Sequence, residues 1–533
     1  MKERNFLTQR RKDTQTRRLF FAAFLFFALF LSACFSSKQT NQSETNSATG
    51  EETLDVPNPN INLARPLVIS QKSEDVALAK KIDETIEKSE FTNARWGVFV
   101  VSLKDGRVVV ARDAQKLFNP ASIEKTLTSI VALDKLGADF RWTTSLAAAK
   151  EITDGNLDGD LIIYGRGAPD FDETNLENLV AQIQAKGLKH IKGNIVGDES
   201  YFKGDDIGDG WTWNDLQWHY GAEAGALTFK ENQADVFIKD GVPTSSTDVF
   251  QMKNALEPKQ TGKIETYGIK RGLADNQVYI WGNGDKASGT IAVHNPALWT
   301  ARTLKKLLEQ KGIVVDGEAK SVDWKTENRL KIENAVELVR VESKTLAEIV
   351  NRMNKRSVNV YAELLLRTLG KKFGGDAPDE SRQLNEVRGD DSAGTSVIKK
   401  FLRENNVATD EIQIHDGSGL SRLDFVTPEA FGRALVFAAE SKSADVFETS
   451  LPIAGTDGTL GGRLAKAKGK ILAKTGSITY VNSLAGYAQA ANGEIFAFVI
   501  IGNNLTRQRD AVTLTDAIAL TLTEDSQHRD AGK

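Results

Sequence analysis

Three short polar motifs in this chain hold side chains that together could carry out nucleophilic catalysis. They are SIEK at residues 122–125, SVN at 357–359 and KTGS at 474–477. In a helix, residues three apart lie about one turn apart on the same face, so the Lys125 amine can reach the Ser122 hydroxyl. Serine is a weak nucleophile until a base takes its proton, and lysine becomes that base where burial and nearby positive charge lower its pKa.

The order and the setting of the motifs carry this interpretation, because each motif alone is common. A second S-x-x-K occurs at residues 396–399, which we interpret as a surface helix. It follows Ser357, so the order S-x-x-K, S-x-N, K-T-G is met only when Ser122 is the nucleophile. Each motif also lies on a suitable element: the start of an apolar helix, the start of a second helix, and the end of a β-like run. Lys474, at the end of that run, is the expected source of positive charge near Lys125.

The two ends of the chain supply the elements expected to hold these motifs. Asp105-Gly106 and Asn492-Gly493 each separate two β-rich runs, which predicts a β-hairpin near either end. Apolar residues at helical spacing predict helices over 75–89 and 507–522. Further helices are predicted after Lys344, where they should cover the sheet. We therefore predict an α+β fold in which both ends of the chain form one antiparallel sheet flanked by helices.

The middle of the chain has a different pattern. Residues 140–335 are rich in short β-like runs, glycine and aspartate, and two similar helix–strand segments pass through Lys186-Gly187 and Lys311-Gly312. This pattern predicts one or two β-rich inserted domains. The catalytic domain is then expected to comprise residues 74–139 and 336–525, with 526–533 as a tail.

The N-terminus reads as an export signal. A basic stretch is followed by an apolar run over 19–33, which suits a signal peptide and is short for a membrane span. The run ends at Cys34, in a sequence that resembles a lipoprotein signal box, so residues 1–34 predict export and lipidation of Cys34. An ordinary signal peptide and an uncleaved anchor are the alternatives. Residues 35–73 are mostly polar and aperiodic, which predicts a disordered tether that holds the enzyme at a membrane in the periplasm or cell envelope.

Composition narrows the function classes. The chain has 533 residues, 40% of them hydrophobic, which is enough for several cores. Its net charge of −4, with no strongly basic stretch after the N-terminus, argues against nucleic acid as a partner. One cysteine cannot form an internal disulfide, and five scattered histidines lack zinc-ligand spacing. We expect no metal and no cofactor, and the sequence predicts no oligomeric state.

Together, the three motifs resemble those of penicillin-binding proteins and, more narrowly, the type-4 low-molecular-mass D-alanyl-D-alanine carboxypeptidase/endopeptidase family. The resemblance covers roughly residues 75–525, and the long gap between the first two motifs matches the large inserted domains of that family. It extends over the runs at 120–144, 416–422, 451–463 and 474–487. Two features depart from the family pattern: Ser477 stands where threonine is frequent, and the lipoprotein-like leader is not typical.

The resemblance implies a β-lactamase/transpeptidase-like fold and an acyl-enzyme reaction on peptidoglycan stem peptides, with β-lactams bound at the same serine. Ser122 is the implied nucleophile and Lys125 the general base, while the backbone N–H groups of Ser122 and Ser477 form the oxyanion hole. Ser357 relays a proton to the leaving amine, and Asn359 holds the peptide and helps orient Lys125. The residues implied for the substrate carboxylate, with the glycine of their motif, are Lys474, Thr475, Gly476 and Ser477.

Two rival functions are weighed against this reading. Class A β-lactamases deacylate with a glutamate in an E-x-x-L-N segment, which we do not find here, so penicillin is expected to stay on Ser122. A non-catalytic wall-binding or β-lactam-sensing protein of the same fold is the second rival, and three intact motifs argue against it.

Two further clusters have open roles. The loop at 416–419 is either a functional loop near the site or a tight turn that supports the sheet. Its D-G-S-G sequence is not the G-x-S-x-G of an α/β-hydrolase elbow. The aromatic residues within 211–220 either stack against sugars or pack a small domain.

Overall fold

The computed structural model describes residues 54–258, 264–376 and 389–524. The predicted signal peptide with Cys34, the first part of the predicted tether and the tail at 526–533 lie outside these residues. The described chain divides into two compact units. The smaller comprises residues 235–270 and 277–290, and the larger holds the rest.

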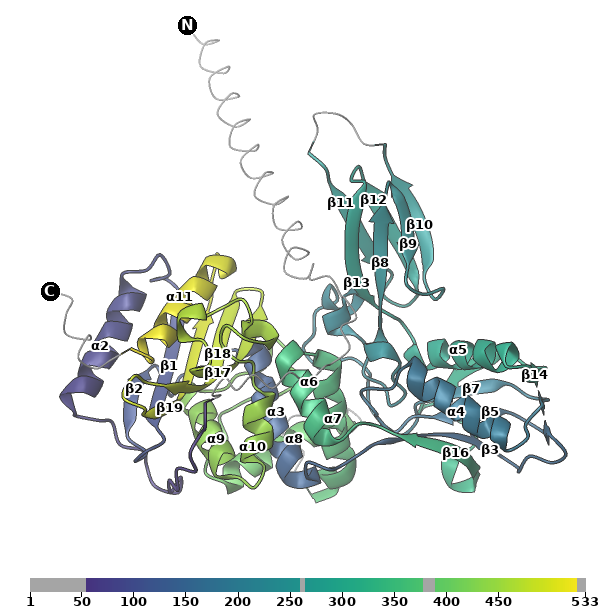
Figure 1. Cartoon of the computed structure of the whole chain (residues 1–533), viewed down its shortest axis with the longest axis horizontal. Coiled ribbons are helices and arrows are strands. Elements are labelled where there is room, and N and C mark those ends of the chain that lie inside the picture. The colour runs from purple at the N-terminus through teal and green to yellow at the C-terminus, as the bar shows by residue number, and fades with distance from the viewer. Residues whose placement is uncertain (1–53, 259–263, 377–388, 525–533) are drawn as a thin grey trace, which may run out of the picture. The chain divides into compact units, whose positions relative to one another are not determined.

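The larger unit is built on a five-stranded antiparallel sheet that joins the two ends of the chain (Figure 1). Its strands, in spatial order, are β17 (Ile471–Ile478), β18 (Val481–Gln489), β19 (Ile495–Asn503), β1 (Arg95–Ser102) and β2 (Val108–Arg112). The chain ends meet where β1 pairs with β19, in a register that sets Phe99 opposite Val499. The sheet predicted from the two hairpin signals is therefore present.

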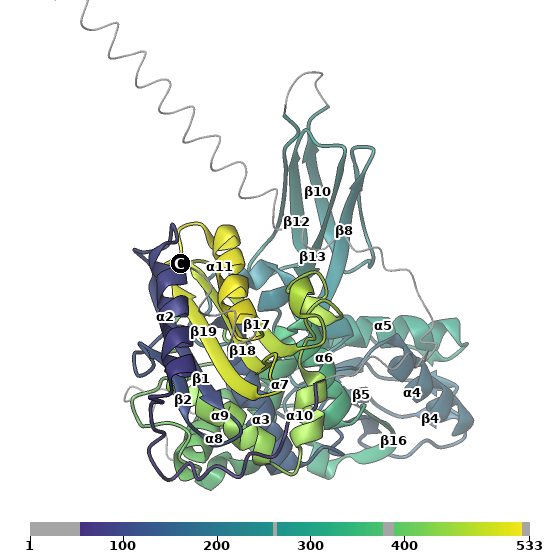
Figure 2. The same ribbon diagram turned by 60° about the vertical axis from the view of Figure 1, so that its left-hand side comes forward.

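Helices cover both faces of this sheet. On one face α2 (Ser73–Glu87) packs on β2, and α11 (Gln508–Thr521) lies across β18 and β19 (Figure 2). Leu78, Ile82 and Ile518 from these helices are fully buried against the strands. The other face receives α9 (Pro428–Glu440), which contacts β1 and β19.

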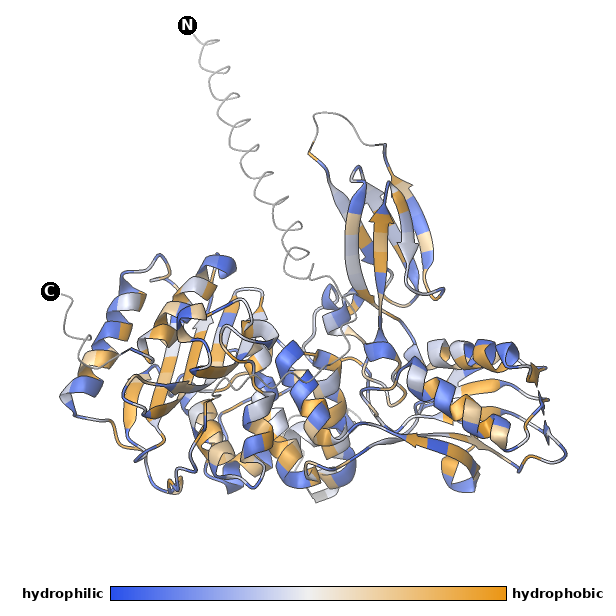
Figure 3. Cartoon of the chain, in the orientation of Figure 1, coloured by the Kyte–Doolittle hydropathy of each residue, from blue (hydrophilic) through white to orange (hydrophobic). Residues whose placement is uncertain are grey.

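A group of helices next to the sheet carries two of the three motifs. Its members are α3 (Glu124–Leu136), α6 (Leu346–Arg356), α7 (Asn359–Phe373), α8 (Asp390–Glu404) and α10 (Ala444–Ser450). The strands of the sheet are predominantly hydrophobic, whereas these helices carry both hydrophobic and hydrophilic residues (Figure 3). Within the described residues, no helix has the length and hydropathy needed to cross a bilayer.

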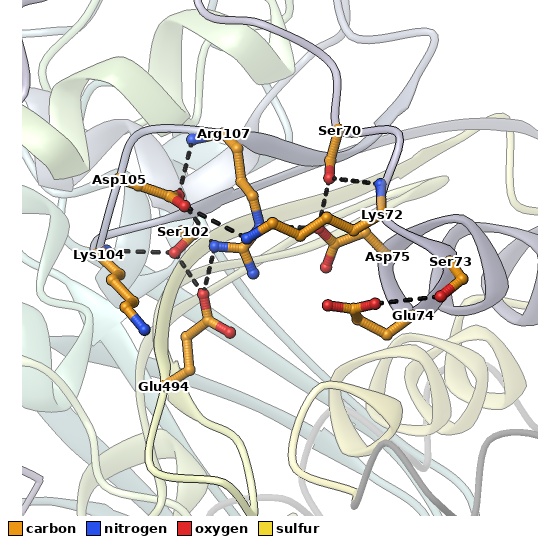
Figure 4. A network of polar contacts seen from close by, with 10 residues as sticks. All are labelled: Ser70, Lys72, Ser73, Glu74, Asp75, Ser102, Lys104, Asp105, Arg107 and Glu494. Atoms are coloured by element: carbon orange, nitrogen blue, oxygen red, sulfur yellow. Dashed lines mark hydrogen bonds and ion pairs between the residues drawn. The ribbon is translucent and has the colours of Figure 1, made fainter.

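An ion-pair network fixes the chain ends to one another (Figure 4). The Arg107 guanidinium contacts Asp75 Oδ2 at 2.7 Å, Glu494 Oε1 at 2.6 Å and Asp105 Oδ1 at 2.9 Å. Asp75 lies in α2 and Glu494 in the turn between β18 and β19, so one side chain joins three elements. Burial raises the pKa of Glu494, but the hydrogen bonds from Arg107 and Ser102 outweigh it and lower the pKa overall.

The block predicted as inserted contributes four of the five strands of a second sheet in the larger unit, and the fifth strand, β16 (Val336–Glu342), begins directly after the block. The order of this sheet is β15 (Ala319–Val322), β7 (Ile195–Asp198), β5 (Leu161–Tyr164), β3 (Thr143–Ala148) and β16. Two helices, α4 (Glu173–Ala185) and α5 (Pro296–Gln310), precede its strands β7 and β15. The two similar segments also pair with each other, since β15 runs parallel to β7 and β14 (Val314–Val315) runs parallel to β6 (His190–Ile191). Here β4 (Asn156–Leu157) pairs with β6 on its other side.

The helices and strands of the smaller unit, among its described residues, are all β-strands. It contains two three-stranded sheets, β13-β8-β9 and β10-β12-β11. The bounds of these strands are β8 (Gln233–Lys239), β9 (Val242–Ser245), β10 (Gln251–Leu256), β11 (Tyr267–Arg271), β12 (Gln277–Gly282) and β13 (Lys286–Ala292).

The last part of the predicted tether is ordered, which corrects the expectation of disorder through residue 73. Leu54, Val56 and Leu63 are each more than nine-tenths buried. Ser70 N–H donates to the Val108 carbonyl oxygen at 2.8 Å, so the segment pairs with the edge of β2. An exposed strand edge offers unpaired backbone groups to any neighbouring extended chain, and here this segment takes them.

Candidate active site

Ser122 lies in a one-turn 3₁₀ helix, η1 (Ala121–Ile123), that runs directly into α3. Two glycines let neighbouring segments close against this turn. A Cβ at Gly419 would lie 2.0 Å from the Ala121 carbonyl oxygen, and one at Gly476 would lie 3.0 Å from Ile123 N. The loop at 416–422 and strand β17 can therefore both approach the Ser122 backbone, as only a residue without a side chain permits.

Lys125 is fully buried beneath Ser122. Its Nζ lies 2.9 Å from Ser122 Oγ and donates to the Ser418 carbonyl oxygen at 2.7 Å. Burial lowers the pKa of Lys125 to about 8, although the carboxylates of Asp416, Glu363 and Glu124 act in the opposite direction. A substantial neutral fraction near physiological pH lets this amine accept the serine proton.

The second and third motifs meet at one hydrogen bond. Lys474 Nζ donates to Ser357 Oγ at 2.8 Å and to the Thr475 carbonyl oxygen at 2.8 Å. Ser357 caps the C-terminus of α6 in a left-handed conformation, with φ of 58°. Burial and, secondly, the charge of Lys125 lower the pKa of Lys474, so the two lysines are close enough to repel one another.

Strand β17 is an edge strand of the sheet, and its outer side pairs with residues 452–454 over Ile471–Ala473. The Ala473 N–H donates to the Pro452 carbonyl oxygen at 2.9 Å on the side away from β18. Alternate residues of a strand point their N–H groups to the same side, so the Ser477 N–H faces this edge. The Ser122 N–H belongs to the first helical turn, where N–H groups have no intrahelical acceptor. The two N–H groups proposed for an oxyanion hole thus come from adjoining elements.

Asn359 begins α7, and its amide Nδ2 donates to the Tyr220 carbonyl oxygen at 2.8 Å. Tyr220 belongs to the block predicted as inserted. Trp211, from the same block, donates its indole N–H to Asp416 Oδ2 at 2.7 Å. The sequence-based interpretation of these aromatic residues considered sugar stacking and packing, and it missed both polar contacts with the site.

The loop at 416–419 is a tight turn that also contacts the candidate base, through the carbonyl of Ser418. The sequence left a functional loop and a tight turn as alternatives. The structure combines them, because the tight turn presents the Ser418 carbonyl to Lys125. Thr459 was also missed: its hydroxyl lies 2.8 Å from Thr475 Oγ1. Both residues lie in runs that carried the family resemblance, 416–422 and 451–463, which was the available signal.

The second S-x-x-K does not lie on a surface helix, so that expectation was wrong. Ser396 and Lys399 are 5% and 6% exposed in α8. The Ser396 hydroxyl donates to the Ser392 carbonyl oxygen at 3.0 Å. The reason is the close packing of α8 on α7, where a Cβ at Gly394 would lie 2.2 Å from the Leu366 carbonyl oxygen.

Buried carboxyl groups surround Lys125. Burial raises the pKa of Glu124 and of Asp424, and it raises that of Glu363 to about 7 despite the adjacent Arg367. The Glu363 and Arg367 side chains pair at 2.9 Å. Across the described ranges no cluster of side chains could hold a metal ion. At Ser122 a serine hydroxyl lies within hydrogen-bond distance of a buried amine whose pKa is lowered.

Comparison with known families agrees with this arrangement. The model of the D-Ala-D-Ala carboxypeptidase 3 (S13) family matches residues 78–525, and this chain belongs to that family. It is thus one of the serine-type D-alanyl-D-alanine carboxypeptidases, which are hydrolases.

Particular relatives cover most of the chain. It is 28% identical over 481 residues to a D-alanyl-D-alanine carboxypeptidase of Actinomadura sp., which covers 85% of each protein. It is 28% identical over 426 residues to the D-alanyl-D-alanine carboxypeptidase DacB of Haemophilus influenzae, covering 76% of this chain and 84% of that protein.

A solved structure supports the fold. The crystal structure of penicillin binding protein 4 (DacB) from Haemophilus influenzae superposes with a TM-score of 0.71 at 25% identity, covering 82% of this chain and 98% of that one. The predicted family and the predicted transpeptidase-like fold are therefore confirmed.

Proposed function

We propose that this protein removes the terminal D-alanine from peptidoglycan stem peptides through an acyl-enzyme on Ser122. The observation that carries the proposal is the 2.9 Å contact between the Ser122 hydroxyl and the buried Lys125 amine. Family membership and the names of the two carboxypeptidase relatives support the reaction class.

The chemistry follows from the positions of these groups. Lys125 takes the proton of Ser122, whose Oγ forms a bond to the carbonyl carbon of the penultimate D-alanine. The oxyanion is stabilised by the N–H groups of Ser122 and Ser477, in a setting where such preorganised donors contribute several kcal/mol. The peptide C–N bond then breaks, Ser357 relays to the leaving amine the proton that Lys125 took from Ser122, and free D-alanine departs. Water finally hydrolyses the ester and restores the hydroxyl.

Substrate binding is assigned to the outer edge of β17 over residues 474–477, beyond the part that pairs with residues 452–454. Lys474, with the hydroxyls of Thr475 and Ser477, faces the terminal carboxylate, and Gly476 lets the strand lie against the Ser122 turn. Asn359 is assigned to the peptide backbone. The hydrogen bond from its amide to the Tyr220 carbonyl oxygen supports a role in holding the segment around Tyr220 beside the start of α7.

The same acyl-enzyme would serve two related reactions. When the leaving amine belongs to a cross-linked neighbour, the step is that of a DD-endopeptidase. When the carbonyl belongs to a β-lactam, the acyl group stays on the enzyme, because the chain has no E-x-x-L-N segment to activate a deacylating water. We therefore include endopeptidase activity and penicillin binding in the proposal.

The setting of the enzyme is also part of the proposal. Residues 1–34 act as an export signal that leaves a lipid on Cys34, and the tether after it places the enzyme at a membrane in the periplasm or cell envelope. The catalytic domain comprises 74–139 and 336–525, and residues 140–335 form its inserted domains. The separate β unit at 235–270 and 277–290 and the four strands that the block gives to the second sheet support an insertion here.

The test is mass spectrometry of the full chain treated with penicillin, together with release of D-alanine from a pentapeptide and cleavage of a cross-linked dimer. The wild type is expected to carry one penicillin adduct, on the peptide that contains Ser122. Ser122→Ala should lose both the adduct and the activity. Ser396→Ala is the matched control, because it removes the other S-x-x-K serine from a buried helix and should behave as wild type. An adduct that persists in Ser122→Ala would refute the assignment.

A further inference from the structure

We propose that Trp211 is a positioning residue for the general base: its indole holds Asp416, and Asp416 holds the loop whose Ser418 carbonyl receives the Lys125 amine. The inference rests on the proposed role of Lys125. Trp211 lies in the block predicted as inserted, so this block would contribute to the acylation step.

The side chain of Asp416 organises the whole loop. It is fully buried, and its two oxygens accept five hydrogen bonds. The donors are Trp211 Nε1 at 2.7 Å, Ser418 Oγ at 2.9 Å, Gly419 N at 2.7 Å, Leu420 N at 3.0 Å and Ser421 N at 2.9 Å. Four come from the loop itself, and the indole is the one donor among these five that arrives from another segment.

The loop held in this way contacts the candidate base and its helix. The Ser418 carbonyl oxygen accepts from Lys125 Nζ at 2.7 Å, and the Gly417 carbonyl oxygen accepts from Thr128 Oγ1 at 2.7 Å. Gly419 has a φ of 76°, which favours glycine and turns the chain against Ala121. A change at Asp416 therefore moves the acceptor that orients the lysine amine.

Trp211 is itself built into its position. Its ring lies against Gly208, where a Cβ would be 2.4 Å from the indole nitrogen. The ring also packs on the buried cluster of Ala121, Leu420, Ile478 and Val481. The neighbouring Gly210 carbonyl oxygen accepts from Arg422 N at 3.2 Å, so the segment runs alongside the end of the loop.

The charged groups around Lys125 predict how the loss of the Trp211 indole would change the pKa of this lysine. Three carboxylates raise the pKa of Lys125: Asp416 from the loop, Glu363 from α7 and Glu124 from α3. The charge of Lys125 in turn lowers the pKa of Lys474 in β17. The Asp416 charge favours the protonated amine, and the indole N–H stabilises that charge. Without the indole hydrogen bond, Asp416 is no longer held in place beside Lys125. Its charge then favours the protonated amine less, so the pKa of Lys125 falls while the amine loses its orientation.

The experiment measures the second-order rate constant for penicillin acylation of the full chain as a function of pH, for wild type, Trp211→Phe and Trp324→Phe. Trp211→Phe should acylate about tenfold more slowly on the plateau, as expected for losing one hydrogen bond to a charged group, and its acid limb should lie at lower pH. Trp324→Phe is the matched control, because it removes an indole hydrogen bond to the Gly204 carbonyl and should match wild type.

Each other outcome decides the question. A Trp211→Phe protein that acylates like wild type overturns the inference, as does one that is slower at every pH with an unmoved acid limb, since packing alone gives that pattern. Should Trp211→Phe not fold, Asp416→Asn keeps the shape of the side chain and removes its charge, and an acid limb that stays in place in that variant overturns the inference. A wild type without an adduct on Ser122 refutes the proposed function instead.

Discussion

Acylation of Ser122 should follow the titration of Lys125. Burial lowers the pKa of this amine to about 8, so about one-tenth of it is neutral at pH 7 and about nine-tenths at pH 9. Because the neutral amine is the base, the second-order rate constant for penicillin acylation should rise about tenfold over that interval and then level off.

The assay is the rate of adduct formation, followed by mass spectrometry in buffers of constant ionic strength. Lys125→Arg is the companion variant: it keeps a positive charge but cannot deprotonate in this range, so its residual rate should be low and show no such limb. A wild-type rate that is flat between pH 7 and pH 9 would refute the assignment of Lys125 as the base.

The ionisation of Lys125 should also make the free energy of unfolding depend on pH, and proton linkage gives the direction of the change. The folded-state pKa of Lys125 lies below the ordinary value for lysine, about 10.4. Between about pH 8 and about pH 10.4 the unfolded chain therefore binds more protons than the folded one. Over that window the wild type should gain stability with rising pH relative to Lys125→Met, by up to about 3 kcal/mol. Denaturant unfolding of both proteins at several pH values measures this, and parallel curves would contradict it.

Three further predictions concern the neighbourhood of the site and the sheet that supports it. Lys474→Ala should slow penicillin acylation by about 100-fold or more while the protein still folds, because a buried donor facing the substrate carboxylate is lost; normal reaction with penicillin would show that its role is misassigned. Gly476→Ala should slow acylation and lower the melting temperature by the equivalent of about 1–3 kcal/mol, because its Cβ would lie 2.1 Å from Ser483 Oγ; calorimetry and the adduct assay measure both. Arg107→Ala should cost about 3 kcal/mol of unfolding free energy, because it leaves the buried Asp75 without its cation; unfolding in urea measures the loss, and the rate of acylation per folded molecule should stay unchanged.

Much of the site was predictable because its parts are local. Ser122 and Lys125 are three residues apart at a helix start, so backbone geometry alone brings amine and hydroxyl together. The hairpin turns at Asp105-Gly106 and Asn492-Gly493 are equally local, and the structure has strand pairs on both sides of each.

Other features could not be predicted from local pattern. Ser396 has the same spacing to Lys399 as Ser122 has to Lys125, yet α8 packs it away against α7. Leu54, Val56 and Leu63 stand in a polar stretch that composition assigns to a tether, yet each of them is more than nine-tenths buried.

The sequence by itself determined which residue types are available and which neighbours share a helix face or a turn, since those relations depend only on backbone geometry over a few residues. Only the tertiary structure decided that Lys474 reaches Ser357, 117 residues away along the chain, and that Trp211 reaches Asp416, 205 residues away. Such contacts depend on how whole elements pack. The apolar contacts that bring the two elements together are made by other residues, so the local sequence around either partner does not reveal the pair.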